Sequence, residues 1–447
     1  MPSRPFNRVI ERFTLDQNTV EMLSAHACAV SKFSLQRSAG GGAPPDFTYF
    51  GLEVTPITQE QASDYTDGTF DGGAESDPDF RKVPFQGGVF TYLPYDATAG
   101  SREDAKAVFW LVTKLLIIDH TKAQAFIVSI QANETEFDSG GTQRSCKNLV
   151  DEIIRSPAPL PSAVDGTSRK AIDWEVDTSI DEYQGKIREI QTRIARDELH
   201  QAILSVGLSK TTSATADAVF NVMRRRNSSP HIFLVRSDDI TLIGASPAMH
   251  LRKSGRLLTV ETDAGTRRLG ETEDETQAIM NELLNAEKDL EEQKMIVDET
   301  IADLKAIAAD AKVEMPVELE VRKLGSVMHL YTVLEAQIKE GLSPIEAVLS
   351  CFPPSAVTGA PRHQAMKVIQ QVEGTPRGPY GGVLGLIGFD GSVDTAIILR
   401  SAWVKGDRIT MRCGGGITHA SDAMDEYNEC MNKAQSMIDC VREAEAF

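Results

Sequence analysis

The chain has 447 residues, of which 41% are hydrophobic and 25% charged, a balance that is ordinary for a folded globular protein. Its formal net charge of -19 at pH 7 repels phosphate backbones and anionic lipid surfaces, so neither nucleic acid nor a membrane is an expected partner. Six scattered cysteines without CxxC spacing favour neither a disulfide framework nor a structural zinc site, and no apolar stretch reaches 18 residues. We therefore expect a cytoplasmic protein with reduced thiols.

The N-terminal third is weakly patterned. Turn-forming residues at 38–45 and 66–79 predict surface loops, and the stretch 155–170, with three prolines among small and polar residues, predicts a linker. Residues 1–165 are therefore a divergent N-terminal part, and the stronger signals begin at residue 166. Length alone does not decide between one domain and several.

Beyond the linker, Ser179 and Glu182 form a capping box before apolar residues spaced by three and four, which predicts a helix ending near Arg196. A short apolar run, LHQAILSV, and a further helix follow. The segment HIFLVRSDDITLIGAS then alternates like two strands, and RLLTVETDAGT continues the strand-rich pattern.

Helical spacing returns from Thr272 to about residue 309. In LSPIEAVLSCF, Ser343 as the N-cap followed by proline at the first helical position predicts another helix. TGAPRHQAMKVIQQV reads as a loop feeding a helix. Three strand candidates follow, namely GGVLGLIGF, VDTAIILRSAWV and RITMRCGGGI. Antiparallel hairpins between long helices indicate an α+β fold and not a doubly wound parallel sheet.

Two acidic pairs have the same helical spacing. In SDAMDEYNECMNKA, a predicted helix, Glu426 and Glu429 share one face with Lys433, and Asp289 and Glu292 repeat the spacing on the helix after Thr272. Four carboxylates facing one another need a cation, and oxygen-only ligation favours magnesium, manganese or calcium over zinc. The alternative is that each pair is simply solvated on a helix surface.

Other polar positions are ambiguous from sequence alone. Residues 358–361 (TGAP) fit either an anion seat at a helix start or an ordinary proline-initiated helix. DAGT, residues 263–266, reads equally as a turn. His329 fits a buried structural histidine as well as a catalytic one, and Arg400 could simply reach solvent.

Taken in order, a set of short motifs resembles the chorismate-utilising enzymes, which include anthranilate synthase component I, aminodeoxychorismate synthase component I, isochorismate synthase and salicylate synthase. These motifs are HQAILS, ASPAMHLR, DAGTRRLGET, DLEEQKMIVD, GSVMHL, AVTGAPRHQAM, RGPYGG, DTAIILR, CGGGI and EYNECMNKA. They span about residues 170–440, and VPFQGGVFTYLPYD extends a fainter likeness into the N-terminal third.

The resemblance implies one large α+β domain, residues 1–447, in which two packed antiparallel sheets are surrounded by helices and 166–447 form the catalytic core. It also implies a Mg²⁺ site. Glu292 and Glu429 would be direct ligands, with Asp289 and Glu426 acting through water. The metal would hold the ring carboxylate of chorismate, which reconciles an acidic protein with a dianionic substrate.

Further matches imply substrate-binding residues. Tyr380, Arg400 and Lys433 match positions that bind the substrate carboxylates. The backbone of Gly265, Gly414 and Gly416 would line the cleft. Thr266 and His329 match polar residues near the ring, with His329 close to the groups that leave.

Two positions bear on the reaction. Gln201 stands where water-using members carry a lysine base, and an amide cannot deprotonate water. Ala264 stands where aminodeoxychorismate synthases carry a nucleophilic lysine. The resemblance therefore implies amination at ring carbon 2 with ammonia, giving anthranilate or 2-amino-2-deoxyisochorismate. The ammonia would come free or from a separate glutamine amidotransferase subunit.

Two departures oppose a simple transfer of function. Ala248 replaces the glutamate that the resemblance gives as general acid, a role worth roughly 100- to 10,000-fold in rate. The segment IVDETIADL differs from the usual LVDLxRND. Together with the short chain, they favour an enzyme of specialised metabolism. The alternatives are a salicylate or isochorismate synthase, and a chorismate-binding protein whose turnover is lost because of Ala248.

Overall fold

The computed structural model describes residues 6–38, 45–68, 77–99, 106–132, 174–237, 239–324 and 327–446. The predicted linker at 155–170 lies outside these ranges, as do residues 39–44 and 69–76 of the two predicted loops. Among the described residues, no helix is both long and apolar enough to cross a membrane.

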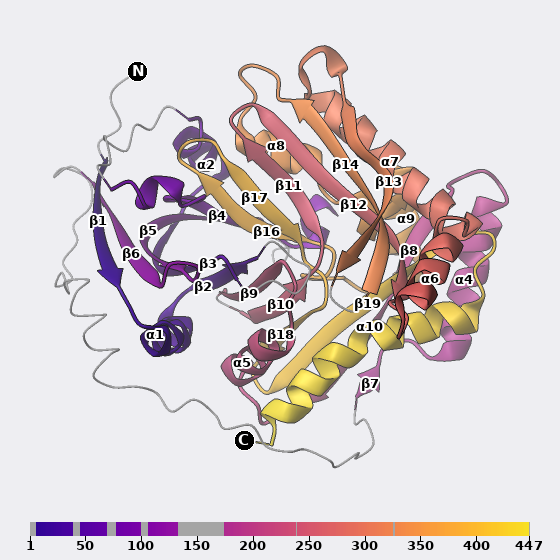
Figure 1. The fold of residues 1–447 in the computed structure, drawn as a ribbon. Coiled ribbons are helices and arrows are strands. Elements are labelled where there is room, and N and C mark those ends of the chain that lie inside the picture. The colour runs from indigo at the N-terminus through magenta and orange to yellow at the C-terminus, as the bar shows by residue number, and fades with distance from the viewer. Residues whose placement is uncertain are drawn as a thin grey trace.

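The described strands form antiparallel ladders in two arms that share β5 (Figure 1). The first arm runs, in order of pairing, through β8 (Gln201–Thr211), β19 (Arg408–Ile417), β18 (Ser401–Lys405), β10 (Thr241–Ser246), β9 (His231–Arg236), β2 (Phe33–Arg37), β3 (Phe47–Pro56) and β5 (Val108–Asp119). The second arm leaves β5 through β4 (Gly88–Leu93), β16 (Val383–Gly388), β17 (Val393–Ile397), β11 (Met249–Ser254), β12 (Leu257–Arg268), β14 (Val327–Gln337) and β13 (Glu314–Leu324). Four further described strands extend this framework: β6 (Gln124–Ala132) pairs with β5, β1 (Phe6–Thr14) pairs with β6, and β7 (Glu175–Val176) and β15 (Gly359–Ala360) pair with β8.

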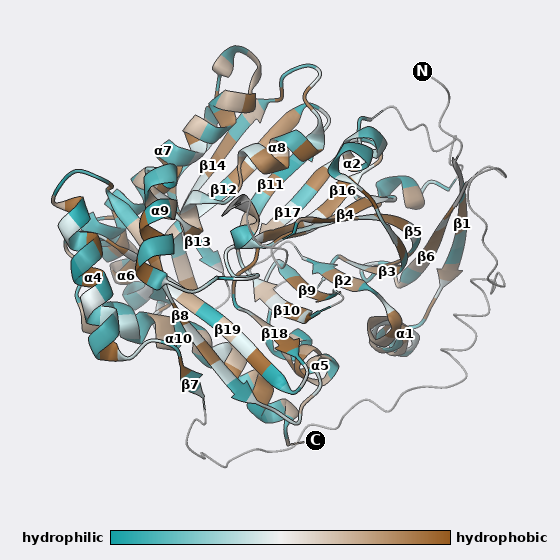
Figure 2. Ribbon diagram, turned by 180° about the vertical axis from the view of Figure 1, so that it is seen from behind, coloured by the Kyte–Doolittle hydropathy of each residue, from teal (hydrophilic) through white to brown (hydrophobic). Residues whose placement is uncertain are grey.

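Helices cover the outer faces of both arms. They are α1 (Gln17–Val30), α2 (Gln59–Tyr65), α4 (Ile180–Ile194), α5 (Ala216–Arg226), α6 (Glu273–Leu283), α7 (Glu287–Ile307), α8 (Pro344–Ser350), α9 (Arg362–Glu373) and α10 (Ala423–Ala444), with short 3-10 turns at Phe80–Lys82, Tyr95–Ala99, Ala309–Ala311 and Ser355–Val357. One buried cluster joins α1, α4, α5, α9 and α10 to the first arm, and a second joins α2, α7 and α8 to the second arm. Strands β5 and β6 are largely apolar, whereas outer helices such as α7 and α9 alternate polar and apolar segments (Figure 2).

The inner faces of the two arms pack against each other through aromatic side chains. Phe33 of β2 stacks on Phe90 of β4 with ring centroids 4.3 Å apart, and Phe90 lies 5.6 Å from Trp110 of β5. Such pairs add about 0.5–1.5 kcal/mol beyond the burial of their apolar area. The predicted α+β fold with two packed antiparallel layers is confirmed, with β5 shared between them.

Local sequence signals account for several helix starts. The capping box predicted at Ser179 is present, and the helices predicted to begin at Thr272 and Ser343 also start with capping boxes. In each, the side-chain oxygen accepts from the backbone N–H three residues on. Asp422 caps α10 by accepting from the N–H groups of Met424 and Asp425.

Two local predictions were wrong. The helical segment after Thr272 is two helices, because Asn285 turns its amide back onto the Asn281 carbonyl at 2.6 Å and α6 ends at Leu283. The strand predicted through Arg400 is two strands, β17 and β18, with Arg400 at φ +45 between them. Residues 263–266, which the sequence left open between strand and turn, lie inside β12.

Candidate active site

The triple glycine of β19 lies beneath polar side chains from distant parts of the chain. A Cβ at Gly414 would lie 2.7 Å from Tyr380 Oη, and a Cβ at Gly415 would lie 3.1 Å from Glu426 Oε2. A Cβ at Gly416 would overlap Gln201 Nε2 and lie 3.1 Å from Glu292 Oε1. Any side chain on this strand end would therefore displace one of these groups. Glycine is required here for close approach and not for an unusual backbone angle.

The predicted acidic residues on α7 and α10 are brought together by two lysines. Lys288 Nζ of α7 donates to Glu426 Oε1 at 2.8 Å, and the same oxygen accepts from Ser421 Oγ at 2.8 Å. Lys433 Nζ lies 2.7 Å from Glu429 Oε1 and donates to the Gly414 carbonyl at 3.0 Å. The prediction that both acidic pairs lie on helices is confirmed, and the two helices face one another across the glycine strand.

Asp289 is held differently. Its Oδ2 accepts from Arg267 Nη2 at 2.7 Å, and a Cβ at Gly265 would lie 2.9 Å from its Oδ1. Asp289 therefore connects α7 to the β12 segment that carries Gly265.

Glu292 has the most perturbed carboxyl in this group. Its pKa is raised to about 7, chiefly by burial. Repulsion from Glu429 and Asp289 adds to the rise, while the ammonium groups of Lys433 and Lys288 oppose it. At Glu429 burial acts to raise the pKa, but Lys433 outweighs it and holds the pKa below its ordinary value. Glu292 therefore keeps its proton to higher pH than Glu429 does.

The donor set fits a hard divalent cation, because every candidate ligand is a carboxylate oxygen. The ligands are not yet convergent: across the described ranges, no three His, Cys, Asp or Glu side chains gather closely enough to hold a metal ion. Lys288 and Lys433 supply the positive charge that the carboxylates need. A cation entering the group would take over the pairing that these ammonium groups now provide.

Gln201 begins β8 and is 1% exposed. Among the described residues its buried Nε2 has no hydrogen-bond partner. This atom lies so close to Gly416 that a Cβ on that residue would overlap it. An unpaired buried donor is costly, so this amide is suited to a bound polar group.

A second group of polar residues lies on one face of the β12–β14 ladder. A bulge at Gly265, with φ +60, interrupts the register between Ala264 and Thr266, and Thr266 pairs with His329. Thr266 Oγ1 lies 3.1 Å from His329 Nδ1. Burial lowers the pKa of His329, so the ring favours its neutral form. Ala264 is buried and provides no functional group.

Asp263 belongs to the same group and was not singled out from the sequence. It lies on the face of β12 that carries Thr266, opposite Tyr331 in the register. Burial raises the pKa of Asp263, while the His329 ring, when it is protonated, and the Arg400 guanidinium act to lower it. The signal that could have found it is a pair of carboxylates two positions apart, Glu261 and Asp263, on the face of β12 opposite its buried residues.

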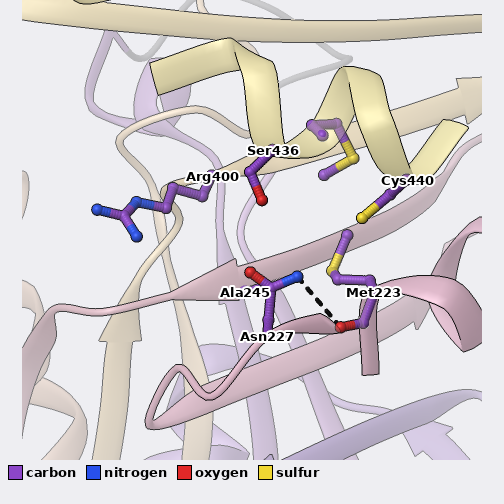
Figure 3. Close-up of a pocket in the computed structure, with 7 residues that line it drawn as sticks. Met223, Asn227, Ala245, Arg400, Ser436 and Cys440 are labelled. Carbon is purple, nitrogen blue, oxygen red and sulfur yellow. Dashed lines mark hydrogen bonds between the residues drawn. The ribbon is translucent and has the colours of Figure 1, made fainter. Parts of the chain in front are cut away.

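Arg400 lies at the break between β17 and β18, and its side chain is exposed. Its left-handed backbone costs about 1–3 kcal/mol, a strain that is concentrated at functional sites. A small pocket lies on its other side, between Met223 and Asn227 at the end of α5 and Ser436 and Cys440 of α10. Figure 3 shows the guanidinium pointing away from this pocket.

Tyr380 is buried beneath the glycine strand and is held by a buried ion pair. Arg377 lies 5.7 Å from the Tyr380 ring centroid and 4.5 Å from that of Tyr95. Its guanidinium pairs with Glu373 at 2.8 Å, and Glu373 also accepts from the N–H and Oγ of Ser205. This network fixes Tyr380 against β8 and β19.

Ala248 lies in a small apolar cluster with Tyr95, Val357 and Ile397. The nearby His250 is not a free proton donor, because Nδ1 lies 3.0 Å from Thr395 Oγ1 and Nε2 3.1 Å from the Cys351 carbonyl. His200 is exposed and pairs through its backbone with Ala360.

At the helix start after TGAP, carboxylates of the protein bind the first helical residue. The Arg362 N–H donates to Glu299 Oε2 at 3.2 Å, and the Arg362 side chain pairs with Asp303 at 2.6 Å. The anion predicted for this seat is thus a carboxylate of α7, from the segment IVDETIADL.

The geometry can be compared with known proteins. Residues 46–439 match the family model described as chorismate binding enzyme. Anthranilate synthase component 1 of Thermus thermophilus is 33% identical over 373 residues, covering 81% of this chain and 79% of that protein. The Geobacillus stearothermophilus protein of the same name is 29% identical over 384 residues, covering 81% and 76%.

Solved structures show the same fold. The menaquinone-specific isochorismate synthase of Escherichia coli superimposes with a TM-score of 0.75 at 19% identity, covering 99% of this chain and 96% of that one. Anthranilate synthase component I of Streptococcus pneumoniae gives a TM-score of 0.69 at 22% identity, covering 98% and 93%. The chain therefore belongs to the chorismate-binding enzyme family, as its motifs predicted.

Proposed function

We propose that the protein catalyses the Mg²⁺-dependent amination of chorismate at ring carbon 2 with ammonia. The product is 2-amino-2-deoxyisochorismate, or anthranilate where pyruvate is then eliminated. The observation that carries the proposal is Gln201, whose buried Nε2 has no hydrogen-bond partner among the described residues and lies beside Gly416, as does Glu292 Oε1 of α7. We further propose that the chain folds as one unit with a divergent N-terminal part, since β2 pairs with β9 and β4 with β16.

The chemistry of each side chain gives it a separate role in the proposed reaction. Gln201 binds the nucleophile without being able to deprotonate water, which favours ammonia over hydroxide. Tyr380, Arg400 and Lys433 bind the carboxylates of the substrate, and an arginine suits a bidentate carboxylate contact. Ala264 leaves no nucleophile on β12, so the amine adds to the ring directly.

Glu292 and Glu429 would hold the magnesium ion, with Asp289 and Glu426 beside them. Bound magnesium would neutralise the ring carboxylate. Lys288 and Lys433 keep the acidic group paired until then. Thr266 orients the His329 ring near the groups that leave, through the bond to Nδ1.

The test is to incubate the purified protein with chorismate and magnesium, with ¹⁵N-ammonium or without it, and to identify the products by mass spectrometry. We expect a product that carries one ¹⁵N atom and forms only with ammonium. Glu429→Ala should abolish it, whereas Asp425→Ala, an exposed carboxylate one turn away on α10, should not. A hydroxylated product without ¹⁵N would overturn the proposal. Gln201→Lys should move the product toward hydroxylation.

A further inference from the structure

Asp263 is a carboxyl group in the candidate site that has no part in the proposed function so far. It projects from the same face of β12 as Thr266, because the bulge at Gly265 brings residues 263 and 266 to one side of the strand. Across the ladder this face carries His329 and Tyr331 of β14. Asp263 therefore lies beside the residues expected to contact the ring of the substrate.

The charges around Asp263 come from three further elements. Arg400 after β17 and Arg322 of β13 are positive neighbours, Glu261 of β12 is a negative one, and the His329 ring of β14 is positive only when it is protonated. Arg322 is itself committed to Glu261 at 3.2 Å and to the Tyr331 ring at 4.7 Å. The groups left to interact with Asp263 are thus His329 and Arg400.

The expulsion of a ring hydroxyl needs a proton, and the obvious donors are absent or engaged. Ala248 has no proton to give, and both ring nitrogens of His250 are bonded within the core. His329 is held by Thr266 and by the Gly265 backbone.

Asp263 and Ala248 also lie at corresponding positions of two neighbouring segments. The β11–β12 ladder ends at the pair Arg252 and Thr259. Ala248 and Asp263 each lie four residues beyond this pair, at the same end of the two strands. The residue directly before β11 therefore has no carboxyl, whereas the neighbouring strand carries one at the same end.

We propose that Asp263 is a catalytic residue, the acid that protonates the departing hydroxyl of chorismate in place of the side chain missing at Ala248. This deepens the proposed function and rests on it. As ammonia forms its bond to ring carbon 2, both ring double bonds shift, from carbons 1 and 2 to carbons 1 and 6 and from carbons 5 and 6 to carbons 4 and 5, and the bond from carbon 4 to the hydroxyl oxygen breaks. The Asp263 carboxyl gives its proton to that oxygen, which leaves as water. The new ammonium group then loses one proton, which restores the carboxyl.

The raised pKa of Asp263, caused first by burial, is in keeping with this role because it keeps the acid protonated at higher pH than an exposed aspartate. The Arg400 guanidinium stabilises the carboxylate once the proton has left. The geometry of the face, and the engagement of His250 and His329 in other bonds, carry the assignment, and the pKa supports it.

The test compares four forms of the protein: wild type, Asp263→Asn, Ala248→Glu, and the two changes combined. We expect Asp263→Asn to lower kcat by 100- to 10,000-fold with the KM for chorismate within about threefold. The combined variant should recover at least tenfold over Asp263→Asn, because a glutamate at 248 supplies the proton again. Glu261→Gln, on the same face two residues away, should stay within about twofold of wild type. The pH profile of kcat should lose its alkaline limb in Asp263→Asn.

The outcomes separate the two proposals. Asp263→Asn with activity within fivefold of wild type overturns the role of Asp263. A large loss that the glutamate at 248 does not relieve overturns it as well, since the loss is then structural. A wild-type product that is hydroxylated and not aminated overturns the proposed amination only, because that reaction also expels the ring hydroxyl. A wild type that consumes no chorismate overturns both.

Discussion

Gly416 leaves the space that the Gln201 carboxamide fills: a Cβ at position 416 would overlap Gln201 Nε2 and lie 3.1 Å from Glu292 Oε1. The two residues are brought together by the β8–β19 ladder, in which Gly416 pairs with Ile203. The amide proposed to bind the nucleophile and a candidate metal ligand thus both approach Gly416, where there is no room for a side chain.

Gly416→Ala should leave the fold intact and damage the site. Gly416 does not have a positive φ, and the atoms that the methyl group meets are the ends of side chains, which can move. We expect kcat/KM to fall by at least about tenfold, because a displacement near 1 Å can cost up to about 100-fold. Activity and thermal unfolding of the same sample are the measurements.

The matched control is Gly185→Ala. Gly185 lies in α4 with open space around its Cβ position. Alanine should stabilise the helix by up to about 1 kcal/mol and leave activity unchanged. If Gly416→Ala also leaves activity unchanged, Gln201 does not act where we place it.

Lys288→Met should make the protein more responsive to magnesium. The ammonium of Lys288 pairs with the buried Glu426 at 2.8 Å, and a cation has to compete with it for that carboxylate. Without magnesium the variant should lose about 1–3 kcal/mol of stability, because Glu426 keeps only Ser421 as a partner. The rise in melting temperature across a magnesium titration should exceed that of wild type. Lys294→Met, an exposed lysine on the same helix, should respond as wild type does.

Much of the framework could be predicted from sequence because its signals are local. The capping boxes at Ser179, Thr272 and Ser343 each lie within four residues, and the alternation in β9 and β10 lies within one segment. The helical spacing of Glu426 and Glu429 follows from periodicity alone. These features need no knowledge of what packs against them.

The remaining features depend on contacts between distant segments. The pairing of Lys288 with Glu426 joins residues 138 positions apart, so no local pattern shows it. The break at Arg400 was missed because its flanking residues alternate like one strand. The β13–β14 hairpin was missed because β13 carries charges on an exposed edge. Asp263 reads as part of a turn until the bulge at Gly265 places it.

Glu373→Gln should strongly destabilise the protein. Glu373 and Arg377 are both buried, and removal of the carboxylate leaves an uncompensated guanidinium beside the Tyr95 and Tyr380 rings. Breaking such a pair costs about 3–5 kcal/mol. Urea unfolding is the measurement. Glu189→Gln, which breaks the exposed pair with Arg193 on α4, should cost less than about 1 kcal/mol.

Buried histidines should make stability fall as the solution is acidified. Burial lowers the pKa of both His231 and His250 to about 4, so in the folded protein they stay neutral at pH 5. In the unfolded chain their pKa returns to about 6.5 and they bind protons as pH falls through that value. The unfolded state therefore gains protons first, and each histidine should cost about 2 kcal/mol between pH 7 and pH 5.

Other groups shift in the opposite direction, so the comparison with a variant is the decisive one. Burial raises the pKa of Glu292 to about 7 and that of Asp303 to about 6, and both add stability as pH falls. These contributions are common to wild type and variant. In urea unfolding at pH 7 and pH 5, His250→Gln should lose about 2 kcal/mol less than wild type between the two conditions. An equal loss in both proteins would mean that His250 is protonated in the folded state, and that its two bonds, to Thr395 and the Cys351 carbonyl, do not hold it in the neutral form.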